Sequence, residues 1–90
     1  MKFLTDSEIN GLEKSILNIL KNKELVSGND IYKTIAFRLK KDESLINEIV
    51  YEKLNEMAES GNIARYTLQT LSKYSFVNRL PKYFYTKVPQ

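Results

Sequence analysis

The spacing of hydrophobic residues predicts three amphipathic helices followed by two strands. The first helix is expected from Asp6 to about Lys23. Its apolar side chains recur at helical intervals and should form one buried stripe: Ile9, Leu12, Ile16, Ile19 and Leu20. Thr5 precedes the segment and Glu8 follows three residues later, which is the pattern of a capping box.

A second helix is expected to start after Ser27 and to end near Leu39. Ser27 can cap this helix, and Asp30 follows three residues later with a shorter acid. The apolar line consists of Ile31, Ile35 and Leu39, with Ala36 beside it. The outer face and the end of the helix carry positive charge, which suits the helix dipole, at Lys33, Arg38, Lys40 and Lys41.

The third helix should open at Asp42 or Ser44 and stop at Gly61, which is well placed as a left-handed residue. Its apolar face is formed by Ile46, Val50, Leu54 and Met57, and Leu45 and Ile49 widen it. The opposite face is left with Ser44, Asn47, Glu48, Tyr51, Glu52 and Asn55.

Two segments after Gly61, residues 63–70 and 82–88, are rich in strand-forming residues and predict a long hairpin. Because side chains alternate along a strand, Tyr83 and Tyr85 are expected to pack on the core. Phe76 and Val77 near the tip either fold back on the domain or contact a partner. The fold class is therefore α+β and mainly helical, in a single domain spanning residues 1–90.

Composition removes several classes of function. The 90 residues include no cysteine and no histidine, so disulfide staples, the commonest general base and the commonest metal ligand are lacking. No apolar run is long enough to cross a bilayer, and the N-terminus turns polar too early for a secretory signal. We therefore expect a cytoplasmic protein that is not an enzyme and needs no cofactor or metal.

Charge is distributed unevenly along the chain. Residues 1–60 hold nine of the 14 basic residues and all 11 acidic residues, a net charge of −2, whereas residues 61–90 hold five basic residues and a net charge of +5. A basic segment attached to a near-neutral body indicates contact with a polyanion. Charge alone equally fits a solvated surface that protects the edge strands.

Three helices followed by a hairpin is the order of a winged helix domain. The junction between the third helix and the hairpin, Val50 to Ile63, resembles the recognition helix and turn of the PadR-like and MarR-like winged helix-turn-helix repressors. Upstream, Ser27 to Tyr32 is similar to the Gly-led entry into the second helix of PadR-like proteins. Downstream, Arg79 to Thr86 resembles their basic-then-aromatic return strand. The resemblance covers most of residues 12–88.

The resemblance implies a sequence-specific regulator of transcription that binds double-stranded DNA and is therefore nucleoid-associated. The recognition helix, residues 43–60, would enter the major groove, and the wing, residues 63–88, would hold the backbone. A homodimer on two half-sites is expected, with Phe3, Leu4 and the first helix as its surface. The candidate DNA-binding residues are Lys33, Arg38, Lys40, Lys41, Ser44, Asn47, Glu48, Tyr51, Arg65, Lys73, Arg79 and Lys82.

Several of these residues have a second interpretation. Tyr51 contacts a base or phosphate, or packs half-buried on the domain. Ser44 and Asn47 read bases, or Ser44 is only a cap and Asn47 only solvated. Arg79 and Lys82 flank the tip of the wing, where phosphate contact is favoured over solubility.

The third helix itself is acidic, with six acidic residues and only Lys53 between Asp42 and Ser60. Carboxylates are repelled by phosphates, although Glu48 or Glu52 can accept a hydrogen bond from a cytosine amino group. The alternative function is a protein-interaction module that presents this helix to a basic partner. RNA binding is a third possibility if the aromatic residues of the wing are exposed for stacking.

Overall fold

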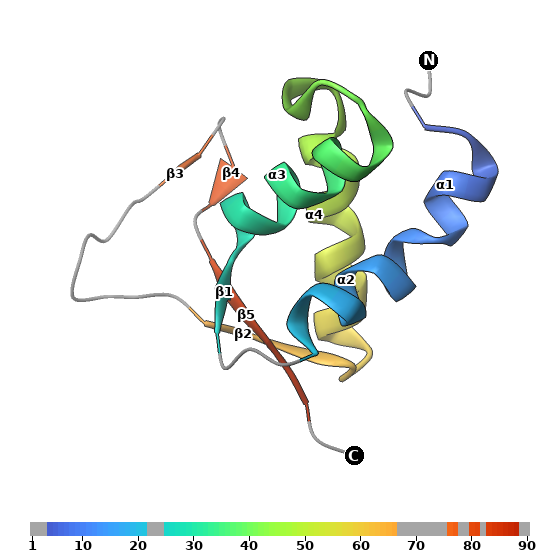
Figure 1. The fold of residues 1–90 in the computed structure, drawn as a ribbon. Coiled ribbons are helices and arrows are strands. Elements are labelled where there is room, and N and C mark those ends of the chain that lie inside the picture. Colours follow the sequence, from blue (N-terminus) through green and yellow to red (C-terminus); the bar gives the residue numbers. More distant parts are fainter. Residues whose placement is uncertain (1–3, 22–24, 67–75, 78–79, 82, 89–90) are drawn as a thin grey trace.

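The computed structural model describes residues 4–21, 25–66, 76–77, 80–81 and 83–88 of the chain. Helices pack on one side of a small antiparallel sheet (Figure 1). In chain order the elements are α1 (Asp6–Asn10), α2 (Leu12–Leu20), β1 (Val26–Ser27), α3 (Gly28–Leu39), α4 (Glu43–Glu59), β2 (Ile63–Tyr66), β3 (Phe76–Val77), β4 (Leu80–Pro81) and β5 (Phe84–Lys87). The predicted fold class, α+β and mainly helical with a winged helix layout, is confirmed.

The start of the first helical segment is a complete capping box. Oγ1 of Thr5 accepts from the backbone N–H of Glu8 at 3.1 Å, and the backbone N–H of Thr5 donates to Oε1 of Glu8 at 2.8 Å. The prediction of one unbroken helix was wrong, because a turn at Gly11 separates α1 from α2 and α2 ends at Leu20. Glycine disfavours helix by about 1 kcal/mol relative to alanine.

Helices α3 and α4 have the predicted N-terminal caps. Oγ of Ser27 accepts from the N–H of Asp30 at 3.2 Å, and Oδ1 of Asp42 accepts from the N–H of Ser44 at 3.0 Å. Lys40, at φ 55° in the left-handed region, ends α3. Its backbone N–H donates to the carbonyl of Phe37 at 3.2 Å, so the turn into α4 is short.

Gly61 ends α4 as predicted. Its φ of 85° lies in the region that favours glycine. The N–H of Gly61 donates to the carbonyl of Ala58 at 3.2 Å, and the N–H of Asn62 donates to that of Met57 at 3.0 Å. These two bonds form a Schellman motif, which turns the chain from α4 directly into β2.

The main sheet has three antiparallel strands in the order β1-β5-β2. The predicted hairpin is present, because β2 pairs with β5 from Ile63 opposite Lys87 to Tyr66 opposite Phe84. A separate pair, β3 with β4, lies between them in sequence. Strand β1, which pairs Val26 with Tyr85, was not predicted, because two residues are too few for a periodic signal.

The core lies between the helices and the main sheet. It is formed by Leu4, Leu12, Ile16, Ile19, Leu20, Val26, Ile31, Tyr32, Ile35, Ala36, Ile46, Val50, Leu54, Met57, Ile63 and Tyr85. The expected burial of Tyr85 is confirmed, and Tyr83 packs half-buried against the core.

Two expectations about apolar side chains were wrong. Leu45 does not widen the buried face of α4, because it is 43% exposed at the first turn, whereas Ile49 does pack against the core. Leu4 is buried in the core of its own chain and is therefore not available as a dimer surface. Among the described residues, no helix has the length and apolar character needed to cross a membrane.

Candidate nucleic-acid interface

The exposed face of α4 begins with a cap and continues with carboxylates. The hydroxyl of Ser44 is exposed and donates to Oδ1 of Asp42 at 2.9 Å, so Ser44 takes part in the cap. The hydrogen bonds from Ser44 lower the pKa of Asp42. Glu48 and Glu52 follow on the same face, and both are exposed as predicted.

Asn47 is not on this face, and its prediction as a base-reading residue was wrong. Its side chain is 3% exposed, and neither Oδ1 nor Nδ2 has a hydrogen-bond partner in the described structure. Asn47 lies one residue beyond Ile46 and three before Val50, both of which are fully buried. At 3.6 residues per turn, this position falls inside the apolar stripe rather than opposite to it.

The wing meets α4 through a cluster of aromatic rings and one guanidinium. The rings of Tyr51 and Tyr83 stack with centroids 6.4 Å apart and an angle of 3° between their planes. Tyr83 meets Tyr85 edge to face, also at 6.4 Å. Tyr51 is therefore a half-buried packing residue, the second of its two predicted roles.

Arg65 is the charged member of this cluster. Its Cζ atom lies 4.5 Å from the centroid of the Tyr83 ring, and its Nη1 donates to Oδ1 of Asn55 at 2.6 Å. Such a cation–π contact stabilises the position of a guanidinium on an aromatic face. Arg65 was among the predicted residues, but its partners were not predicted, because Asn55 lies on α4 and Tyr83 directly precedes β5.

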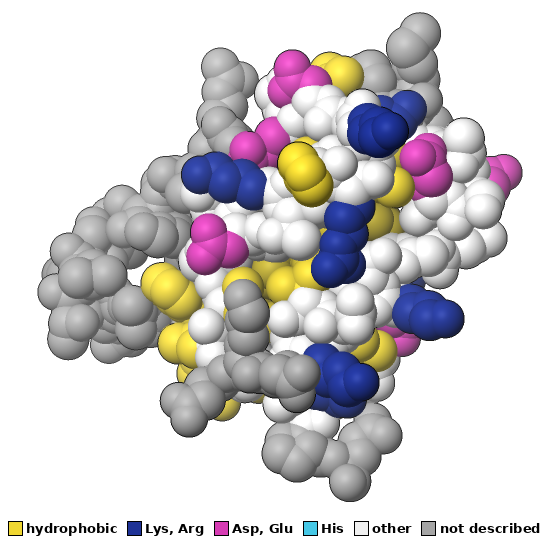
Figure 2. Space-filling view, in the orientation of Figure 1, with side chains coloured by type: hydrophobic (Ala, Val, Ile, Leu, Met, Phe, Trp, Pro, Cys, Tyr) yellow, Lys and Arg dark blue, Asp and Glu magenta, His cyan; other side chains and the backbone are white. Residues whose placement is uncertain are grey.

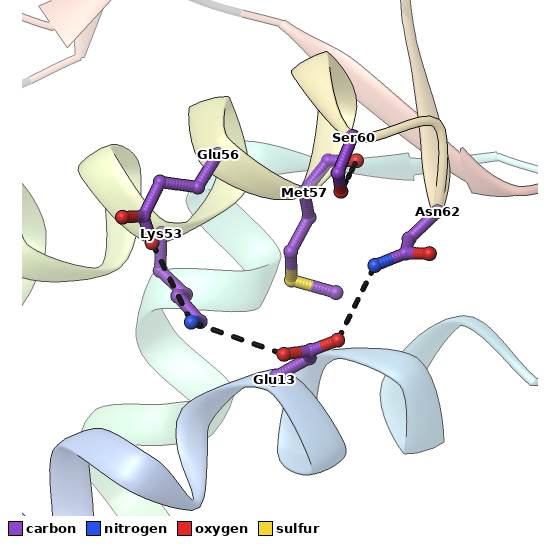
Figure 3. A network of polar contacts seen from close by, with 6 residues as sticks. All are labelled: Glu13, Lys53, Glu56, Met57, Ser60 and Asn62. Atoms are coloured by element: carbon purple, nitrogen blue, oxygen red, sulfur yellow. Dashed lines mark hydrogen bonds and ion pairs between the residues drawn. The ribbon is translucent and has the colours of Figure 1, made fainter.

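The one basic residue of α4 is used on another side of the helix. Nζ of Lys53 lies 3.4 Å from Oε2 of Glu56 and 3.9 Å from Oε2 of Glu13 on α2. Oε1 of Glu13 accepts from Nδ2 of Asn62 at 3.3 Å (Figure 3). Within the described chain, Glu48, Glu52 and Glu59 form no ion pair. The outward face of α4 is consequently acidic.

Positive charge gathers on a different face. All four predicted cations of the second helix and its end, Lys33, Arg38, Lys40 and Lys41, are exposed. Figure 2 shows Lys and Arg side chains spread over α2 and α3 on the face that it presents, with Asp and Glu side chains also on that face. Phe37, which sequence analysis did not single out, is 85% exposed on α3 among these cations. The remaining predicted cations, Lys73, Arg79 and Lys82, lie outside the described residues.

Comparison with protein-family models, with curated proteins and with solved structures found no match to this chain. In the part of the chain that the structure describes, no group of three or more acidic, histidine or cysteine side chains is placed to hold a metal ion. The functional interpretation therefore rests on the layout of the domain and on the charges of its surfaces.

Proposed function

We propose that the chain is a winged helix-turn-helix regulator that binds double-stranded DNA with α4 and the wing. The observation that carries this proposal is the position of Arg65, whose guanidinium is fixed beside α4 by Asn55 and Tyr83. A guanidinium held between the second element of a helix-turn-helix and its wing suits a phosphate at the edge of the groove that α4 would occupy.

The geometry of α3 and α4 supports the same assignment. The short turn at Lys40 and Lys41 joins the two helices, and α4 is followed at once by the sheet. The 17 residues of α4 extend over about 25 Å, and its exposed side is free of other described elements, so it can lie in a major groove about 12 Å wide. Arg65 would then contact the backbone beside the groove.

The acidic residues of α4 affect both the affinity for DNA and the preference among DNA sequences. Glu48 and Glu52 weaken attraction to any duplex, and each can accept a hydrogen bond from a cytosine amino group. The backbone must then be held by cations outside α4, among them Arg65 and the exposed Lys40 and Lys41 at the end of α3. Binding of this kind gives modest affinity for random DNA and a marked preference for sites with correctly placed cytosines.

The proposal is tested by titrating the full chain with a pool of random duplexes at low and at moderate salt. Retardation that weakens steeply with salt is expected, because each phosphate contact releases counterions. If the protein changes the gel mobility of neither random nor selected duplex at low salt, the assignment is overturned.

A second candidate function is favoured by one specific observation, the exposed carboxylates of Glu48, Glu52 and Glu59, which form no ion pair with any other described residue. They would suit a basic protein surface and would make the chain a protein-interaction module. The same titration distinguishes the two candidate functions. A protein-interaction module would not retard the duplex, and it would bind its basic partner most tightly at low salt.

A further inference from the structure

A groove on the face away from the acidic side of α4 is lined by four cations that come from separate elements. Lys14 lies on α2 and Lys21 just beyond it, Arg38 comes from α3 and Lys87 from β5. Ser15, Leu17 and Asn18 complete the lining. Among the residues that the structure describes, no acidic side chain lines this groove and none of its four cations forms an ion pair.

The residues that line the groove determine which class of ligand it can bind. Four cationic groups together with the hydroxyl of Ser15 and the amide of Asn18 supply many hydrogen-bond donors. Leu17, half-buried, is also part of the lining. Phosphate oxygens accept hydrogen bonds from cationic donors of this kind, and such charge-assisted bonds are stronger than neutral ones.

The spacing of the cations fits a chain of phosphates rather than a single anion. Lys14 and Lys21 are seven residues apart, two turns along α2, which corresponds to about 10 Å along its axis. Successive phosphates of one strand advance by about 3.4 Å along a duplex. A span of about 10 Å corresponds to about three such steps, so the groove can follow about four successive phosphates of one strand.

The groove and the proposed DNA-reading face point in different directions. Lys53 and Glu13 join α4 to α2 on the side of α4 that faces α2, whereas Glu48 and Glu52 lie on the outward side. In Figure 1, α2 crosses in front of α4. A backbone in the groove therefore makes contacts that α4 and Arg65 do not make.

We propose that the groove between α2, α3 and β5 is a second nucleic-acid surface, which binds a sugar–phosphate backbone without reading its sequence. This proposal goes beyond the proposed function, because it requires neither α4 in a groove nor Arg65 on a phosphate. With both surfaces occupied, the domain would hold two backbone segments at once.

The test compares Lys14→Gln with Lys21→Gln, made together, against the wild-type chain on a random 30-base-pair duplex. Each phosphate contact contributes about 0.9 to the slope of log affinity against log salt. Loss of two contacts should make the slope shallower by about 1.8 and should weaken binding by more than about tenfold at 0.1 M salt. The pair Lys14→Arg with Lys21→Arg keeps both charges and should keep the wild-type slope.

A matched control separates the groove from net charge. Ser7→Glu with Asn10→Glu changes the net charge by the same two units at exposed positions on α1, outside both the groove and α4. This control should lower affinity much less than the groove pair. Equal losses in both variants, or no change in the groove pair, would overturn the proposal. So would binding of polyglutamate in competition with the duplex at equal ionic strength, because the groove would then be a site for acidic proteins.

The two proposals fail separately in this experiment. If the groove binds DNA and α4 does not, Arg65→Ala leaves duplex affinity unchanged while the groove pair reduces it. If α4 and the wing bind DNA and the groove does not, Arg65→Ala reduces duplex affinity while the Lys14→Gln and Lys21→Gln pair leaves it unchanged.

Discussion

Nη1 of Arg65 on β2 donates to Oδ1 of Asn55 on α4 at 2.6 Å, and this bond ties the base of the wing to the helix. The ring of Tyr83 supports the guanidinium from the other side, at 4.5 Å. Arg65 is thereby oriented before any ligand arrives. A preorganised cation binds with less loss of side-chain entropy than a free one.

Arg65→Ala should weaken binding of all duplexes by a similar factor and should make the salt slope shallower by about 0.9, because one phosphate contact is lost. Asn55→Ala keeps the charge but removes its anchor, so a smaller loss with an unchanged salt slope is expected. Retardation assays at several salt concentrations measure both quantities. Wild-type affinity and slope in Arg65→Ala would remove this residue from the interface.

Leu54 lies in the middle of the buried stripe of α4 and is 0% exposed. Leu54→Ala should lower the free energy of unfolding by about 2–5 kcal/mol through lost burial and the cavity that remains. Urea denaturation followed by circular dichroism measures the change. A loss below about half a kcal/mol would mean that the core around α4 is not packed as described.

Asn47 provides the contrasting case on the same helix. Both polar atoms of its buried amide lack hydrogen-bond partners in the described structure, and an unsatisfied buried group costs about 1–3 kcal/mol. Alanine removes the amide and is also the better helix former. Asn47→Ala should therefore raise the free energy of unfolding by about 1 kcal/mol and leave DNA preference unchanged. A lower stability, or a changed preference among duplex sequences, would contradict this expectation.

Tyr85 links stability to alkaline pH. Burial raises the pKa of Tyr85 and of Tyr32 above the usual value for tyrosine. The unfolded chain releases these protons near pH 10, whereas the folded chain still holds them. The free energy of unfolding is therefore at its full value below about pH 10 and falls as the pH rises further.

Tyr85→Phe should reduce that alkaline loss. It also removes a buried hydroxyl that has no hydrogen-bond partner in the described structure, so stability at pH 7 should rise by about 1 kcal/mol. Urea denaturation at pH 7, 9, 10 and 11 gives the comparison with the wild-type chain. Parallel stability curves for the two proteins would show that Tyr85 is not the titrating group.

Local sequence signals predicted the frame of this fold well. The capping box at Thr5, the cap at Ser27 and the left-handed Gly61 each depend on residues within four positions of one another. The apolar stripe of α4 was likewise correct at Ile46 and Leu54, because helical periodicity alone determines it.

The features that were not predicted from the sequence depend mainly on contacts between distant segments. Strand β1 exists because Val26 and Ser27 find partners about 58 residues later, on β5. The groove cations gather only after α2, α3 and β5 have packed together, so no spacing along the chain reveals them. Asn47 was assigned outward because asparagine is usually exposed. Its burial follows from its position on the helix, which outweighs its polarity.

The most direct test of α4 as the DNA-reading helix is the DNA affinity of the double variant Glu48→Gln with Glu52→Gln. Each variant is titrated with selected and with random duplex at two salt concentrations. A matched control, Glu56→Gln with Glu59→Gln, removes the same charge nearer the C-terminal end of the helix, about 6 Å and about 10 Å beyond Glu52 along the helix axis.

If α4 lies in the major groove, the Glu48 and Glu52 variant should bind random duplex more tightly, because repulsion from phosphate is removed. Its preference for selected duplex should fall by about 1–3 kcal/mol if either carboxylate contacts a cytosine, and the control should change less in both respects. If instead both affinities stay at their wild-type values, α4 does not enter the groove and the protein-partner function takes its place.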